Sequence, residues 1–193
     1  DHAVVTFADS PAQLLGQAGV NPAHEAVVFS DAGLDESAAL AFVALQRAGQ
    51  RRVSVFMDTL DQWAAAGQEV ARVSADASRP TLPPVDYTAT LRTDVLVGGV
   101  HKGAAAYPRV YVASGRTPPT RALEAPVHHV PYAELLKPDG TPKAASDIWK
   151  LLEKAGVPRY AEIVSIADEP GAAAAAFYLL KLMGFPDVKM GMP

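Results

Sequence analysis

Two acidic loops are the places where this sequence could do chemistry. The first is Ser30-Asp31-Ala32, which follows the apolar run AVVF at 26–29. The second follows the apolar run IVSI at 163–166 and consists of Ala167, Asp168, Glu169, Pro170, Gly171 and Ala172. A loop between a buried strand and a helix directs backbone N–H groups toward its mouth, which favours binding of an anion. We therefore treat both loops as candidate sites.

Neither loop can supply a thiol, because the 193-residue chain contains no cysteine. This excludes disulfide bonds, iron–sulfur clusters, thiolate zinc sites and thiol catalysis. Ser30 also lacks the G-x-S-x-G surround of a hydrolase nucleophile, and the nearby His24 has no clear acidic partner in the sequence. We expect no catalytic residue in either loop.

Metal binding is a weaker interpretation of the acidic and histidine residues. The loops and the predicted helix starts contain the carboxylates of Asp31, Asp35, Glu36, Asp168 and Glu169. Such groups could hold a hard cation, but they also stabilise helix N-termini, and we favour that role. His128 and His129 are neighbours on a predicted strand, so they point to opposite faces and cannot share one ion. We expect no metal and no cofactor.

Composition and charge narrow the classes of partner. The chain is 49% hydrophobic and 20% charged, with a net charge of −4, which is typical of soluble globular domains. It has no basic block, so we expect no nucleic-acid partner. No apolar run reaches the ~20 residues of a membrane-spanning helix, so we expect no direct span. No leader is recognisable at the first residues, which leaves a cytoplasmic protein or a processed periplasmic form.

The two loops lie in two copies of one repeated segment. LLGQAGVNPAHEAVVFSD at 14–31 aligns without a gap with LLEKAGVPRYAEIVSIAD at 151–168. Each copy continues with an alanine-rich helix that ends in a glycine, Gly49 or Gly184, and then with a short apolar strand. The loop of the first copy is two residues longer. We infer an internal duplication of a β–α–β unit.

The sequence also predicts the helix that precedes each repeated strand. In the second copy, Ser146 is the expected N-cap and Gly156 ends the helix. Ser10-Pro11 predicts the start of the corresponding first-copy helix. Short apolar strands that alternate with helices predict an α/β fold with open, mostly parallel sheets flanked by helices.

We expect two domains in tandem, at 1–79 and 95–193, joined by a linker at 80–94. The linker region is rich in proline and has no helical or strand period. Before its repeat, the second domain has predicted strands at 95–97, 109–113 and 127–130, and a short helix near 100–106. The first domain has only AVVTFA at 3–8 before its repeat, so we expect it to be N-terminally incomplete.

The order of these motifs resembles the tandem-domain rhodanese, or thiosulfate sulfurtransferase, family. PRVYVASGRTPP at 108–119 is similar to the strand and turn that carry Asp-x-Arg in that family, with Ser114 and Arg116 in those places. APVHHVPYAELLKPDGTPK at 125–143 is similar to the segment that follows. FMDTLDQWAAAG at 56–67 is similar to the end of a first domain. The resemblance implies two rhodanese-like domains, the first of them partial.

The departures from the family pattern imply a catalytically degenerate member. An active member has a cysteine at the mouth of the second loop, where this chain has Ala167. Asp168 and Glu169 would repel an anionic sulfur substrate, and Pro170 removes one backbone donor. The first-domain loop has no thiol either, with Ser30 or Ala32 in the cysteine place. Neither copy can therefore carry a persulfide.

The missing thiol, the acidic loops and the expected incomplete sheets favour a non-catalytic function. We expect a rhodanese-like interaction or scaffold subunit whose partners are other protein subunits. The alternative is a sulfurtransferase-related accessory protein that binds a small sulfur compound or a cation at the degenerate loop. Sulfur transfer through a cysteine donated by a partner is a third, less favoured hypothesis. The sequence does not identify any small-molecule ligand.

Overall fold

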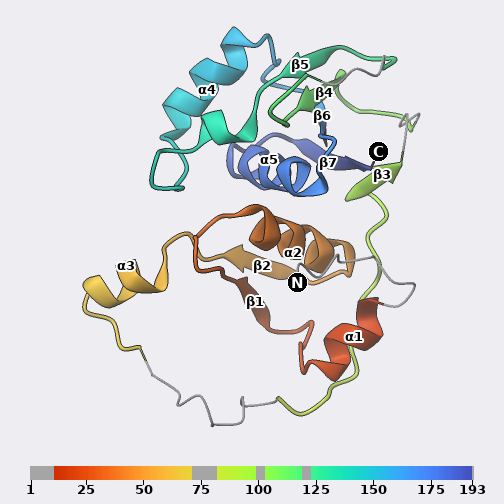
Figure 1. The fold of residues 1–193 in the computed structure, drawn as a ribbon. Coiled ribbons are helices and arrows are strands. Elements are labelled where there is room, and N and C mark those ends of the chain that lie inside the picture. Colours follow the sequence, from red (N-terminus) through yellow and green to blue (C-terminus); the bar gives the residue numbers. More distant parts are fainter. Residues whose placement is uncertain (1–10, 71–81, 99–102, 119–122, 193) are drawn as a thin grey trace.

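The protein is built from two α/β domains whose helices α2 and α5 pack against each other (Figure 1). The computed structural model describes residues 11–70, 82–98, 103–118 and 123–192. The first domain contains α1 (Pro11–Gln17), β1 (Glu25–Val28), α2 (Glu36–Arg47), β2 (Arg52–Val55) and α3 (Leu60–Ala65). The second contains β3 (Leu96–Gly98), β4 (Arg109–Ala113), β5 (Val127–His129), η1 (Tyr132–Leu135), α4 (Ala145–Lys154), β6 (Glu162–Ile166), α5 (Pro170–Leu182) and β7 (Asp187–Met192).

The second-domain sheet has five parallel strands in the order β3-β7-β6-β4-β5. Strands β6 and β4 are central and are almost entirely buried, which is why their sequences are continuous apolar runs. The predicted α/β class with parallel sheets is therefore confirmed. The strand predicted at 109–113 has the observed bounds, and β5 ends one residue before its predicted end.

The described part of the first-domain sheet has two parallel strands, β1 and β2, and Glu25 is in register with Arg52. Helix α2 connects them and packs on the sheet, with its side chains Phe42 and Val43 in the core. The strand predicted at 3–8 lies outside the described residues.

Both copies of the repeated segment form the same parallel β–α–β unit. The first copy is β1-α2-β2, and the second is β6-α5-β7. The helix-ending glycines Gly49 and Gly184 both have a left-handed backbone, with φ of 87° and 78°. Only glycine adopts this conformation without a steric cost, so these residues end both helices as predicted.

The two domains share one hydrophobic core at the contact between α2 and α5. The rings of Phe42 and Tyr178 meet edge to face with centroids 4.8 Å apart, and Phe177 lies 6.3 Å from Phe42. The alanines at 172–176 are buried, and their small side chains allow α5 to lie close to α2 and to the sheet. This contact places Gly171, at the start of α5, against Glu36, at the start of α2.

A polar cluster lies at the opposite, amino-terminal edge of the second sheet. Glu162 is buried and forms ion pairs with Arg109 and Lys189. Burial alone would raise the pKa of Glu162, but hydrogen bonds and charges from Arg109 and Lys189 outweigh it and lower the pKa. The cluster therefore joins β4, β6 and β7 through a buried carboxylate that stays ionised.

The segment expected to be a linker lies along the first domain between residues 82 and 92. Val85 N–H donates to the Gly16 carbonyl at 2.9 Å, and Arg92 N–H donates to the Arg47 carbonyl at 2.7 Å. A Cβ at Gly16 would lie 2.4 Å from the Val85 carbonyl oxygen. Glycine is therefore required where this extended segment crosses α1.

Two local expectations are wrong. Ser146 is not an N-cap, because α4 begins at Ala145 and its cap residue, Ala144, makes no side-chain hydrogen bond. Residues 103–106 of the helix expected near 100–106 are not helical, and the rest of it lies outside the described residues. In both cases the local propensity of a short polar or alanine-rich run predicted a helix or a helix cap that the folded chain does not form there.

Candidate functional site

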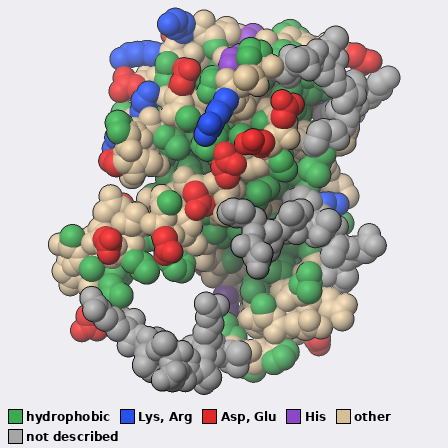
Figure 2. All heavy atoms as spheres, viewed as in Figure 1, with side chains coloured by type: hydrophobic (Ala, Val, Ile, Leu, Met, Phe, Trp, Pro, Cys, Tyr) green, Lys and Arg blue, Asp and Glu red, His purple; other side chains and the backbone are tan. Residues whose placement is uncertain are grey.

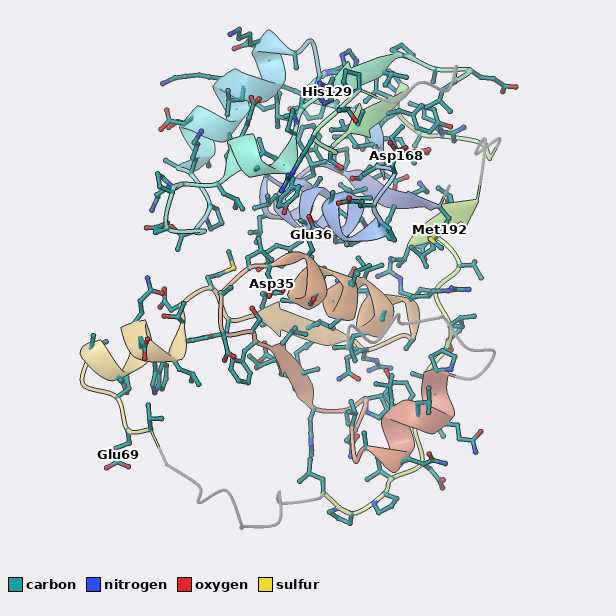
Figure 3. The ribbon with its side chains drawn as sticks, viewed as in Figure 1. Asp35, Glu36, Glu69, His129, Asp168 and Met192 are labelled. Carbon is teal, nitrogen blue, oxygen red and sulfur yellow. The ribbon has the colours of Figure 1, made fainter. Side chains whose placement is uncertain are left out.

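The second-domain loop lies at the carboxyl ends of the central strands, where sites in parallel sheets form. Residues 114–116 follow β4, residues 130–132 follow β5, and residues 167–169 lead from β6 into α5. Figure 3 shows Asp168 on this side of the molecule, with Asp35 and Glu36 at the start of the facing helix α2. The topology therefore brings the sequence-predicted residues Arg116 and 167–172 to one edge.

Hydrogen bonds hold the loop to the neighbouring strands. Ser114 donates from its backbone N–H and from its hydroxyl to the Ile166 carbonyl, at 2.8 and 3.0 Å. The buried Ser165 hydroxyl donates to the Ala173 carbonyl at 2.8 Å. A Cβ at Gly115 would lie 3.6 Å from the Ala167 methyl group. The methyl group of Ala167, the residue that the sequence analysis matched to the family's cysteine, thus lies beside the Ser114–Arg116 turn.

A carboxylate from the first domain lies on this loop. A Cβ at Gly171 would lie 2.4 Å from Oε2 and 2.6 Å from Cβ of Glu36, so the Glu36 side chain packs directly on the Gly171 backbone. The other oxygen, Glu36 Oε1, accepts a hydrogen bond of 2.7 Å from the Tyr132 hydroxyl. The start of α5 therefore already has an internal negative group, which is the type of charge that a helix N-terminus favours.

The charges around Tyr132 show how acidic this mouth is. Burial, and then the hydrogen bond and charge of Glu36, raise the pKa of Tyr132 to about 12. Arg116 acts in the opposite direction, whereas Glu169 raises the Tyr132 pKa further, so both charges lie near this phenol. Figure 2 shows acidic side chains gathered where the two domains meet. An approaching anion would meet more negative than positive charge.

The loop residues differ in exposure. Asp168, Glu169 and Pro170 are exposed, Ala167 is half-buried, and Gly171 and Ala172 are buried. Pro170 is the first residue of α5, and Glu169 is its cap residue without a side-chain hydrogen bond. The carboxylates thus face solvent, and the backbone beneath them is covered by α2.

The first-domain loop is a closed turn with no available nucleophile. The Ser30 hydroxyl donates to the Gly33 carbonyl at 2.8 Å and accepts from the Ala32 N–H at 3.2 Å. Asp35 is the N-cap of α2 and accepts from the Ala38 N–H at 2.7 Å, as the capping hypothesis expected. Asp31 and Ala32 are exposed, and the Ala32 carbonyl lies 3.6 Å from the Cβ position of Gly140 in the second domain.

The adjacent residues His128 and His129 contact two different backbone carbonyl groups. His128 Nδ1 lies 2.8 Å from the Ala155 carbonyl, and His129 Nε2 lies 3.0 Å from the Gly115 carbonyl. Within the described ranges, no group of three or more His, Asp or Glu side chains is placed to hold a metal ion. In the same part of the chain, no helix is long and apolar enough to cross a membrane.

Sequence reasoning assigned Glu36 to its own loop and missed its contact with the second loop. It also missed Tyr132, whose hydroxyl bonds this carboxylate. Tyr132 follows the proline after a predicted strand, so its place at the carboxyl edge could have been recognised. The contact of Glu36 could not, because it depends on how α2 docks on α5.

Comparison with known proteins places this geometry in one structural group. No protein-family model and no curated protein sequence matches the chain. Among solved structures, SseA from Escherichia coli, described as a 3-mercaptopyruvate sulfotransferase with the rhodanese fold, has a TM-score of 0.70 at 19% identity. The match covers 96% of this chain and 71% of SseA.

Two further structures agree. The Tum1 protein from Saccharomyces cerevisiae has a TM-score of 0.65 at 15% identity, over 93% of this chain and 67% of Tum1. An anaerobic ergothioneine biosynthesis enzyme from Chlorobium limicola has a TM-score of 0.66 at 15% identity, over 92% of this chain and 49% of that enzyme. The chain therefore has the fold of the tandem rhodaneses, and it has no cysteine.

Proposed function

We propose that this rhodanese-like chain is a non-catalytic interaction subunit that binds other protein subunits. The observation that carries the proposal is the state of the second loop, which has a methyl group in place of a thiol and a carboxylate of the other domain packed on its helix start. A loop in this state has no group for sulfur transfer, and its remaining exposed groups are suited to contacts with a protein.

The contact surface that we propose is β1 in the first domain. Val27 in β1 and Phe29, which follows the end of β1, are 63% and 54% exposed. Isolated apolar residues are common on surfaces, but two large exposed apolar residues two positions apart form a patch that favours association. In the second domain, the equivalent strand β6 pairs with β7 on one edge and with β4 on the other.

Among the described strands, β1 pairs with β2 alone. The repeat thus supports an extended partner segment that adds to β1 in parallel, as β4 adds to β6. Backbone hydrogen bonds would provide affinity, and alternate side chains over Val27 and Phe29 would provide specificity.

Site-specific photocrosslinking in cells tests this function. A crosslinking amino acid at Val27, Phe29 or Asp168 is expected to give one discrete product of higher mass with a defined protein. The matched controls are Tyr160 and Leu182, which are 73% and 57% exposed on the second domain and should give none. The double variant V27D/F29D should lose the complex and keep its circular dichroism spectrum.

The proposal would be refuted if the intact protein purified as a freely tumbling monomer and if all five crosslinking positions gave the same diffuse crosslinked products. Calorimetric titration with thiosulfate and divalent cations separates it from the alternative of ligand binding at the loop. We expect no heat of binding there, because Glu36 already lies against Gly171.

A further inference from the structure

A second polar site lies at the other end of the first-domain sheet, away from the degenerate loop. It is a cavity of about 930 Å³ between the starts of β1 and β2, the end of α2 and the segment at 86–92. Its volume is within the ~300–1,000 Å³ of small-molecule sites. It is lined by Asn21, Pro22, Ala23, Gln46, Gly49, Gln50, Arg51, Arg52, Asp86, Thr88, Ala89, Thr90 and Arg92.

Three arginines, Arg51, Arg52 and Arg92, line this cavity in a protein whose net charge is negative. Arg92 is held by Asp94 through two hydrogen bonds, of 3.2 and 2.6 Å. Asp86 is the carboxylate of the lining. Arginine forks match the oxygens of a phosphoryl group, so the positive excess favours a phosphorylated ligand.

The other lining residues indicate the chemical nature of the rest of the ligand, beyond its phosphoryl group. Among the described residues that line the cavity, none has an aromatic ring that could stack on a nucleobase, whereas asparagine, glutamine and threonine side chains are present. Gln46 Oε1 is buried without a hydrogen-bond partner among the described residues. A buried acceptor without a partner is costly, and a ligand hydroxyl would satisfy it.

Gln50 gives the cavity a fixed wall. Its amide donates to the His24 carbonyl at 2.6 Å, and its Oε1 accepts from the Tyr87 hydroxyl at 3.1 Å. This buried residue therefore fastens the segment at 86–92 to the sheet. Arg92 then lines the same cavity as Arg51 and Arg52, although these residues come from distant parts of the chain.

The repeat provides an internal comparison. The equivalent position in the second domain is a cavity of about 170 Å³ lined by Trp149, Arg159, Tyr160, Met183, Gly184 and Phe185. There Phe185 follows the helix-ending glycine as Gln50 does in the first copy, and Asp187 occupies the register position of Arg52. The arginine-rich lining thus arose in one copy and is not a general property of the repeated unit.

We propose that this cavity binds a phosphorylated sugar or polyol, with the phosphoryl group on Arg51 and Arg52 and a hydroxyl on Gln46. The site is distinct from the β1 surface, so it would add ligand binding to an interaction subunit. Asp86 repels the phosphoryl group and so limits the affinity. Substitution of Asp86 should therefore tighten binding, whereas substitution of Arg51 and Arg52 should weaken it.

Calorimetric titration of the whole chain at low salt tests the proposal with glucose 6-phosphate, glucose and inorganic phosphate. Glucose 6-phosphate should bind at one site, and the other two should bind at least about tenfold more weakly, because each makes only part of the contacts. R51E/R52E should weaken binding by at least about tenfold. D86N should tighten it.

R159E is the matched control, because it changes the arginine of the second-domain cavity and should leave binding unchanged. Circular dichroism and the melting temperature verify that each variant is folded. The absence of binding by glucose 6-phosphate, equal binding of phosphate and glucose 6-phosphate, or binding that R51E/R52E does not weaken would each overturn the proposal.

Discussion

At the residue scale, the character of the degenerate loop is set by Glu36 as much as by the missing thiol. Ala167 has no reactive atom, and Glu36 brings a carboxylate to the start of α5. Asp168 and Glu169 add two exposed charges. Restoring one atom would therefore not restore the electrostatics that thiol chemistry needs.

This leads to a prediction for Ala167→Cys. The pKa of the new thiol should be equal to or higher than that of an ordinary cysteine, and the pH dependence of its alkylation should show this. Thiosulfate turnover with cyanide should stay at the wild-type background. Neighbouring carboxylates destabilise a thiolate. Adding E36Q, D168N and E169Q to A167C should shift alkylation to lower pH. Turnover of thiosulfate by A167C alone would contradict this account.

Tyr132→Phe tests the bond between the domains. The Tyr132 pKa is raised from 10.0 to about 12, first by burial and then by Glu36. Folding therefore favours the neutral phenol, so its contribution to stability is complete below pH 10 and is lost as the pH rises from 10 toward 12.

Urea unfolding at pH 8 should show Tyr132→Phe to be less stable by about 1.5 kcal/mol, the value of a hydrogen bond to a charged group. The difference between wild type and variant should shrink at pH 11. Because other tyrosines are common to both proteins, the comparison isolates Tyr132. An equal difference at both values of pH would show that the hydroxyl does not bond Glu36.

At the element scale, the contact between the start of α5 and the start of α2 depends on one small residue. Gly171 is the second residue of α5, where alanine would favour the helix by up to about 1 kcal/mol. Its Cβ, however, would lie 2.4 Å from Glu36 Oε2. The two effects have opposite signs, so the measurement decides between them.

We expect Gly171→Ala to lower the free energy of unfolding by about 1–3 kcal/mol, because the added methyl group overpacks the junction. Glu36→Ala in the same chain should recover only part of this loss in a double-mutant cycle, because the Cβ of residue 36 would still lie 2.6 Å from the added methyl group. Gly98→Ala is the control, since a Cβ there meets nothing within 4 Å. Stabilisation by Gly171→Ala would mean that the helices do not approach this closely.

The helices and strands themselves were largely predictable from sequence. Apolar runs and helix-ending glycines indicated both β–α–β units, and β4 was predicted with its observed bounds. The prediction of Ser146 as the N-cap was wrong, because an N-cap preference is local and the cap residue of α4, Ala144, lies two residues earlier. The errors occur at element ends, where the free-energy differences between alternatives are small.

At the scale of the whole molecule, the two domains are coupled through the aromatic residues of α2 and α5. Phe42 is 4% exposed and contacts both Phe177 and Tyr178. A shared core of this kind predicts that the domains unfold together. Without it, each domain would unfold at its own stability.

Phe42→Ala should cost about 3–5 kcal/mol and separate the two transitions. The chain has two tryptophans, Trp63 in the first domain and Trp149 in the second. Fluorescence of W63F and W149F therefore reports each domain alone. Their urea midpoints should coincide in the wild-type background and differ after Phe42→Ala. Coincident midpoints in the variant would show that Phe42 does not couple the domains.

By itself, the sequence determined that these 193 residues contain no cysteine to carry a persulfide and that a β–α–β unit occurs twice, because both follow from residue identity and local periodicity. Only the tertiary structure decided what lies on the degenerate loop and which arginines share a cavity. Glu36 packs on Gly171, and Arg92 lines the same cavity as Arg51 and Arg52. Both arrangements depend on how packed helices and extended segments dock, and that geometry is a property of the whole core rather than of any short stretch of chain.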